Sequence, residues 1–63
     1  MNKKDILKLR RSLGMTQNAF CREYKIPKRI LEMWERGDRT PDLIAKNYLR
    51  VIEAMPTTVK QIV

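Results

Sequence analysis

The sequence predicts an all-α fold class, a compact five-helix bundle, and two observations carry that prediction. Apolar residues recur at spacings of three and four in five segments, and no segment alternates apolar and polar residues as a β-strand does. Glycine, proline and helix-capping residues separate these segments. With 63 residues, the chain suits one domain with a small core, so we treat residues 1–63 as a single domain.

The first two helices have clear end signals. The first is expected over residues 3–13, and Gly14 follows directly, where a left-handed residue can close a helix. Its apolar side consists of Ile6, Leu9 and Leu13. The second is expected over residues 17–24, because Thr16 before it is a suitable N-cap. Its apolar side consists of Phe20, Cys21 and Tyr24.

The third helix is bounded by a proline and a glycine. Pro27 can begin a helix but cannot lie inside one, so the helix is expected to run from Pro27 or Lys28 to Arg36. Gly37 then ends it. The inward side of this helix consists of Leu31 and Trp34.

Two further helices are expected in the C-terminal part of the chain. Thr40, Pro41 and Asp42 predict the start of the fourth helix, because they supply a capping hydroxyl, a first-position proline and a first-turn acid. Its apolar residues are Ile44, Ala45, Tyr48, Leu49 and Ile52. Pro56 ends this helix, and residues 57–63 are long enough for about two more helical turns. The apolar residues of that fifth helix are Val59, Ile62 and Val63.

Positive charge is concentrated in the first part of the chain. The 14 Lys and Arg residues outnumber the 7 Asp and Glu residues, which leaves a net charge of +7, and 11 of the 14 lie within the first 39 residues. Such an imbalance suits nucleic acid as a partner, although it also serves solubility. One charged stretch around the first helix is either a solvated face or a surface that steers phosphates. It consists of Lys3, Lys4, Lys8 and Arg11.

The composition leaves little for enzyme chemistry or for a membrane. The chain has no histidine, one cysteine and two glycines, so it can assemble no His/Cys metal site, no Ser-His or Cys-His pair and no phosphate-binding loop. We therefore expect no enzyme and no cofactor. No apolar run approaches about 20 residues, which predicts no membrane span. A single cysteine fits a reducing compartment, so we expect a cytoplasmic, nucleoid-associated protein.

The second and third predicted helices are joined by a very short connection around Ile26. Two helices joined this tightly cross steeply, so the first presents the second outward. The small side chain of Cys21 suits the crossing, and Ile26 would fill the turn. Residues 17–36 therefore predict a helix-turn-helix, in which the second helix enters the major groove of double-stranded DNA.

A set of residues along this motif also matches a known pattern. They are Leu9-Arg10, Leu13-Gly14-Met15-Thr16-Gln17, Phe20-Cys21, Ile26, Leu31 and Trp34-Glu35-Arg36-Gly37. In these residues the chain resembles the Cro and repressor proteins of lambdoid phages, the XRE family, which implies a lambda-repressor-like bundle. It is more similar still to the HigA-like and MqsA-like antitoxin branch. That likeness rests on Trp34-Glu35-Arg36-Gly37-Asp38-Arg39-Thr40-Pro41, Tyr48-Leu49-Arg50-Val51-Ile52-Glu53 and Pro56.

The resemblance implies a role for each position of the motif. The base-facing residues of the recognition helix would be Lys28, Arg29, Glu32 and Met33. Among them, the guanidinium of Arg29 matches O6 and N7 of guanine, Glu32 could accept from cytosine or orient Arg29, and Met33 could touch a thymine methyl. The residues that contact DNA phosphates would be Thr16, Gln17, Arg36 and Arg39. The family also pairs an acid at Glu35 with the arginine at Arg10.

Other residues are better explained by packing than by function. Trp34 fits the core with its N–H paired, Cys21 fits the helix crossing, and Tyr48 fits a half-buried core position better than a phosphate contact. Ile30 has two interpretations: it pads the DNA-facing surface or it meets a partner.

The turn departs from the family pattern at two positions. The family has glycine at the position of Lys25, so Lys25 must be left-handed or the turn is rearranged, at a cost of about 1 kcal/mol. At the position of Pro27, the family has a capping Ser or Thr. The proline removes this side-chain cap but pre-sets the angle at which the helix begins.

We expect a sequence-specific transcriptional regulator, a homodimeric repressor on a palindromic operator, because a domain this small reads few base pairs alone. The expected dimer interface is Met55, Val59, Ile62 and Val63, with Val51 beside them. Two alternatives keep the DNA-binding domain: an autorepressing antitoxin with a cognate toxin, or a phage or mobile-element regulator, Cro-like or anti-CRISPR-associated. An alternative of a different class is a protein-interaction module using Ile30, Met33 and the C-terminal face.

Overall fold

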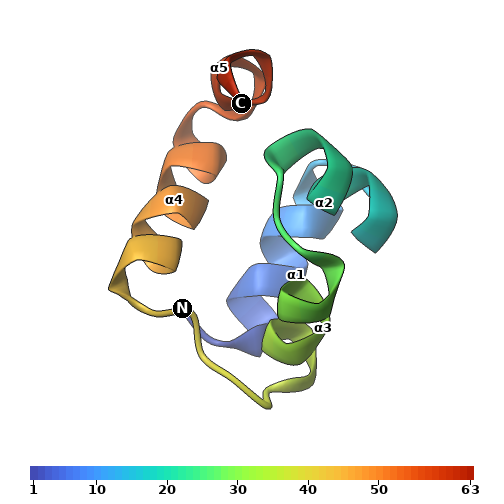
Figure 1. Cartoon of the computed structure of the whole chain (residues 1–63), viewed down its shortest axis with the longest axis vertical. Helices are drawn as coiled ribbons and strands as arrows, with labels where there is room; N and C mark the ends of the chain where they lie inside the picture. Colours follow the sequence, from blue (N-terminus) through green and yellow to red (C-terminus); the bar gives the residue numbers. More distant parts are fainter.

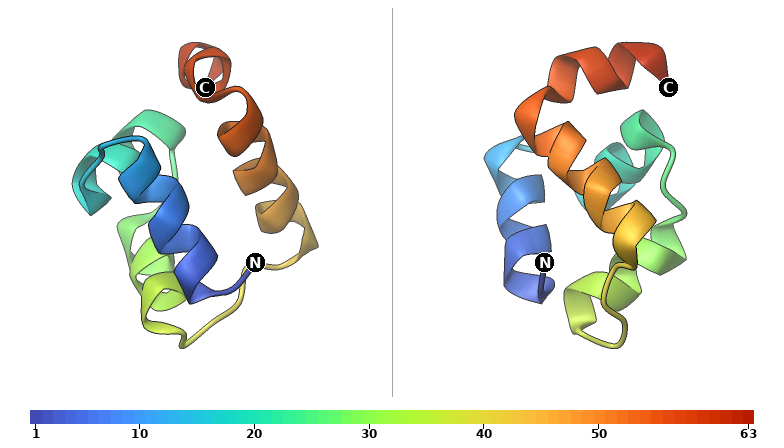
Figure 2. Two further views of the ribbon diagram at one scale, coloured as in Figure 1. Left: turned by 180° about the vertical axis from the view of Figure 1, so that it is seen from behind. Right: turned by 90° about the vertical axis from the view of Figure 1, so that its left-hand side faces the viewer.

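Five helices make up the computed structural model, which describes residues 1–63: α1 (Lys3–Ser12), α2 (Gln17–Tyr24), α3 (Lys28–Arg36), α4 (Leu43–Ala54) and α5 (Pro56–Ile62). The first three helices form one group, in which α3 packs on both α1 and α2. The helix α4 runs beside this group, and α5 turns back from its end to contact α2 (Figure 1, Figure 2). There are no strands, so the all-α prediction is confirmed.

Local capping sets most helix ends as the sequence predicts. The Thr16 hydroxyl accepts a hydrogen bond from the amide three residues ahead at 3.1 Å, and Gly14 and Gly37 are left-handed with φ of 67° and 83°. The helix α1 also has a capping box that the sequence analysis did not include. In it, the Asp5 amide donates to Asn2 at 3.0 Å, and the Asn2 amide donates to Asp5 at 3.1 Å.

The predicted starts of the last two helices were wrong by one to three residues. The helix α4 begins at Leu43 rather than at Thr40-Pro41, and Asp42 is its N-cap, with Oδ1 accepting from the amide three residues ahead at 2.9 Å. Aspartate is the stronger cap of the two candidates, which favours the later start. Pro56 is the first residue of α5 rather than a residue between helices, because a first helical turn does not need its missing N–H.

The core consists of 11 buried side chains from all five helices and the turn between α2 and α3. They are Ile6, Leu9, Phe20, Cys21, Tyr24, Ile26, Leu31, Trp34, Leu49, Ile52 and Val59. Ile44 was expected on the buried side of α4 but is 82% exposed. Each residue turns a helix by about 100°, so Ile44 lies to one side of the face that Leu49 and Ile52 bury.

Two tyrosines attach the C-terminal helices to the end of α2. The Tyr48 hydroxyl on α4 donates to the Tyr24 carbonyl, and the Tyr24 hydroxyl donates to the Pro56 carbonyl at 3.0 Å. Burial raises the pKa of both phenols, which keeps them protonated as donors. Tyr48 is therefore a half-buried packing residue, as expected. None of the five helices has the length and apolar character that crossing a membrane requires.

Candidate nucleic-acid interface

The turn between α2 and α3 is tight, and it is closed by a lysine in a left-handed conformation. Lys25 has φ of 57° and ψ of 42°, so of the two expected alternatives, a left-handed lysine or a rearranged turn, the chain has the first. The next amide, that of Ile26, donates to the Cys21 carbonyl at 3.1 Å, and both side chains are buried. Burial raises the pKa of the Cys21 thiol, so it stays neutral and acts as a packing group. Pro27 precedes α3 without a side-chain cap, as expected.

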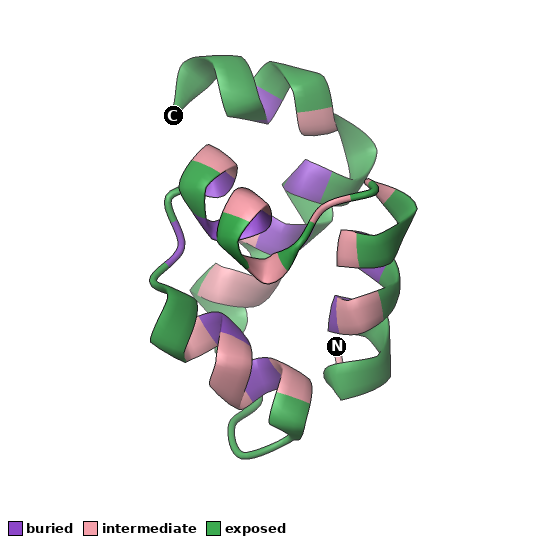
Figure 3. Cartoon of the chain, turned by 90° about the vertical axis from the view of Figure 1, so that its right-hand side faces the viewer, coloured by how far each residue is buried: buried purple, intermediate pink, exposed green.

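The outward side of α3 presents the four residues that were predicted to face bases. Lys28 and Arg29 are exposed, and Glu32 and Met33 are partly exposed. Lys28 and Arg29 take part in no ion pair and no side-chain hydrogen bond within the chain. The opposite side of α3 is buried, so the helix is fixed from behind while this row of side chains is free. The buried residues of α3 are Leu31 and Trp34, and Ile30 packs at the edge of the core. Figure 3 shows buried and exposed residues alternating along the helices.

A shielded ion pair braces α3 from the side of α1. Arg10 binds Glu35 through two parallel hydrogen bonds, Nε to Oε2 at 2.7 Å and Nη2 to Oε1 at 2.9 Å. The exposed fractions of the two side chains are 15% and 7%. The third nitrogen, Nη1, donates to the Met15 carbonyl at 3.0 Å, so Arg10 also holds the segment before α2. The pairing implied by the resemblance is confirmed.

Gln17, the first residue of α2, joins this pair. Its Nε2 donates to Glu35 Oε1 at 3.0 Å. Burial alone would raise the pKa of Glu35, but the hydrogen bonds from Arg10 and Gln17 and the charges of Arg10 and Arg11 outweigh it and hold that pKa below its ordinary value. The hydrogen bond to Glu35 also raises the pKa of Arg10. Glu35 therefore stays ionised and fixes the start of α2 relative to α3.

The other residues predicted to contact phosphates are exposed: Thr16, Arg36 and Arg39. The Thr16 oxygen accepts the capping hydrogen bond, which leaves its hydroxyl hydrogen available as a donor. Arg36 forms an exposed ion pair with Asp38 at 3.0 Å. Arg39 is exposed and forms no ion pair. Trp34 is 7% exposed, and its indole N–H has no acceptor within the chain, so the expected internal partner is absent. No buried side-chain nitrogen lacks a partner, so this N–H lies at the solvent-accessible edge of the side chain.

The residues predicted for a dimer interface do not all lie on the surface. Val59 is 6% exposed and belongs to the chain's own core, because α5 uses it to pack on the rest of the domain. Met55, Ile62 and Val63 are 52%, 77% and 44% exposed. The apolar surface available to a second chain therefore excludes Val59.

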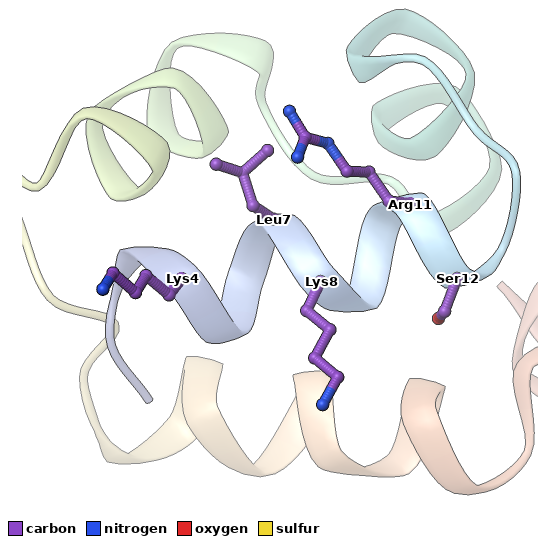
Figure 4. A pocket seen from close by; sticks show the side chains of 5 residues that line it. All are labelled: Lys4, Leu7, Lys8, Arg11 and Ser12. Carbon is purple, nitrogen blue, oxygen red and sulfur yellow. The ribbon is translucent and has the colours of Figure 1, made fainter.

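The hollows on the surface of the molecule are shallow. One of about 520 Å³ lies along the outer side of α1 and is lined by Lys4, Leu7, Lys8, Arg11 and Ser12 (Figure 4). Three of these five residues are cations, so positive charges border this open hollow. No three His, Cys, Asp or Glu side chains come together where they could hold a metal ion.

A tight turn between two short helices, with exposed cations on the second, is typical of a small DNA-binding domain. A model of the helix-turn-helix family matches residues 6–45, more than half of the chain. The chain therefore belongs to the helix-turn-helix family of the XRE type, which consists of DNA-binding transcription regulators and whose shared domain is regulatory rather than catalytic. No curated protein and no solved structure matches the chain at a significant level.

Proposed function

We propose that this protein is a homodimeric transcriptional repressor that binds a palindromic operator with α3 in the major groove. The observation that carries the proposal is the outward row on α3, where Lys28 and Arg29 are exposed and unpaired. A cation on a helix that is packed from behind can reach base edges without first breaking an internal contact. Arg29 reads guanine, and Glu32 and Met33 read the neighbouring base pairs.

In this proposal, Gln17 positions the domain on the sugar-phosphate backbone of the DNA. The Nε2 group has two hydrogens, and one of them is bound by Glu35. The second is free for a phosphate oxygen, so the internal hydrogen bond orients the amide rather than consuming it. Thr16, Arg36 and Arg39 contact the same strand of phosphates around the groove.

The dimer forms through Met55, Ile62 and Val63. These side chains are exposed at the end of α4 and on α5. The helix α5 lies at the opposite end of the molecule from α3 (Figure 1). Two copies related by a two-fold axis place two recognition helices about one turn of DNA apart. Repression then follows from occupation of a promoter by the bound dimer.

The proposal is tested by selecting bound duplexes from a random pool. We expect a palindrome whose half-sites are separated by about one helical turn, and binding that weakens steeply with salt. Sedimentation with the selected duplex should give two chains per duplex. A strict one-to-one complex on an asymmetric site would reject the dimer, and binding that does not depend on salt would reject DNA as the partner.

A second candidate is an antitoxin that represses its own operon. It is favoured by Leu43 and Ile44 at the start of α4, which are 67% and 82% exposed and are not needed for the DNA interface. A toxin could occupy that apolar surface. Co-expression with the product of the neighbouring gene separates this candidate from a phage or mobile-element regulator, because only an antitoxin should rescue growth and co-purify with that product.

A further inference from the structure

The start of α1 lies beside the loop that connects α3 to α4 (Figure 1, Figure 2). A hollow of about 260 Å³ is found there, and side chains from α1, the end of α3 and the loop line it. The residues that matter to its chemistry are Lys3, Arg36, Gly37, Arg39 and Thr40. This loop follows the recognition helix directly, so the hollow lies at the end of the proposed DNA interface.

The side chain of Lys3 lies beside Gly37. A Cβ atom built on Gly37 would lie 3.2 Å from Lys3 Cδ and 3.9 Å from Lys3 Nζ. The aliphatic part of Lys3 therefore lies close to the bare backbone of the loop, and a side chain at position 37 would make a tight contact with it. This contact brings a cation of α1 to the loop, 34 residues away along the chain.

The charges in the hollow are unevenly compensated. Arg36 is paired with Asp38 at 3.0 Å, but Lys3 and Arg39 form no ion pair and are exposed. The backbone N–H of Thr40 donates to no acceptor within the chain. Two free cations and a free backbone donor around one hollow suit an anion with several oxygen atoms.

We propose that Lys3, with Arg39 and the Thr40 amide, binds a phosphate of the DNA backbone next to the groove that α3 occupies. The inference rests on the proposed function, and it adds Lys3 of α1 to an interface otherwise built from α2, α3 and the loop. The ligand is a phosphodiester rather than a base, because a flexible ammonium group supplies charge without the geometry that base recognition needs.

The test compares Lys3→Gln with Lys8→Gln. Lys8 is a matched control, because it lies on the same helix with the same charge but its side chain extends towards α4 (Figure 4). Binding of each variant and of the unaltered protein is titrated over a range of salt, on the selected duplex and on a shuffled duplex. Thermal unfolding checks that the variants are folded to the same extent, and Lys3→Arg serves as a charge-preserving variant.

One phosphate contact contributes about 0.9 to the slope of log affinity against log salt, which is about a threefold change between 50 and 200 mM salt. We expect Lys3→Gln to lower the slope by about that amount and to weaken binding equally on both duplexes. The Lys3→Arg variant should bind much as the original protein does. Lys8→Gln should change the slope much less. If Lys3→Gln and Lys8→Gln behave alike while the unaltered protein binds DNA, the role of Lys3 is rejected and the proposed function stands. If the unaltered protein binds neither duplex, the proposed function fails and this inference fails with it.

Discussion

In the proposed complex, Arg29 is the residue on which sequence preference depends most directly. It is exposed on the outward row of α3 and free of internal partners. We expect Arg29→Ala to relax preference at one base pair of each half-site, which corresponds to about 1–3 kcal/mol of lost discrimination. Arg39→Ala should instead weaken all duplexes alike. If Arg29→Ala instead loses the same affinity on every duplex, Arg29 contacts the DNA backbone and not a base. Affinities for a set of single-base variants of the selected duplex measure the difference.

Glu35 makes the stability of the domain depend on pH in the acidic range. Its pKa is lower in the folded chain than in the unfolded chain, so the ionised form contributes stability that is fully present above the ordinary value of 4.5. This stability is lost as the pH falls from 4.5 through the lowered pKa.

We expect the melting temperature to fall over that acidic range. Glu35→Gln should remove the part of the dependence that Glu35 causes and should destabilise the domain at neutral pH by about 1–3 kcal/mol, because Arg10 loses its charged partner. Thermal unfolding over a pH series checks both. A series for Glu35→Gln that runs parallel to that of the original protein would show that other carboxylates cause the effect.

At the scale of the elements, the turn between α2 and α3 carries conformational strain at Lys25, whose φ is 57°. Glycine adopts this conformation without a steric cost, so Lys25→Gly should stabilise the domain by about 1 kcal/mol. Lys25→Ala is the control, because it removes the charge and keeps the Cβ atom. Chemical denaturation should show a gain for glycine only, and an equal gain for alanine would mean that the charge is the destabilising feature.

Signals that lie close together in the sequence predicted their elements well. Thr16 and Gly37 are read within one helical turn of the ends they set, so the bounds of α2 and α3 follow from the sequence. Where two caps compete, as before α4, the choice depends on Asp42 and was missed.

Contacts between distant residues could not be read from the sequence. The Arg10–Glu35 pair was implied by resemblance alone. The hydrogen bond of Gln17 to Glu35 and the contact of Lys3 with Gly37 were missed, because no local pattern records which helix face meets which loop. The exposure of Ile44 and the burial of Val59 have the same origin.

At the scale of the whole molecule, the proposed dimer depends on a small apolar surface. Ile62 is 77% exposed on α5, so Ile62→Glu should leave the monomer folded and place a charge in the proposed dimer interface. We expect sedimentation to show a shift to monomer and binding to the palindromic duplex to weaken, while binding to a half-site changes little. Leu43→Glu, at a residue that is 67% exposed on α4, is the matched control. If Ile62→Glu still assembles as the original protein does, the interface lies elsewhere.

The two sides of α3 share no residue. Leu31 and Trp34 pack inward and Glu35 holds Arg10, whereas the outward row makes no contact on which the fold depends. The outward side chains can therefore be exchanged without disturbing the brace. If α3 reads the operator as proposed, changes at four positions would give the same scaffold a different operator: Lys28, Arg29, Glu32 and Met33.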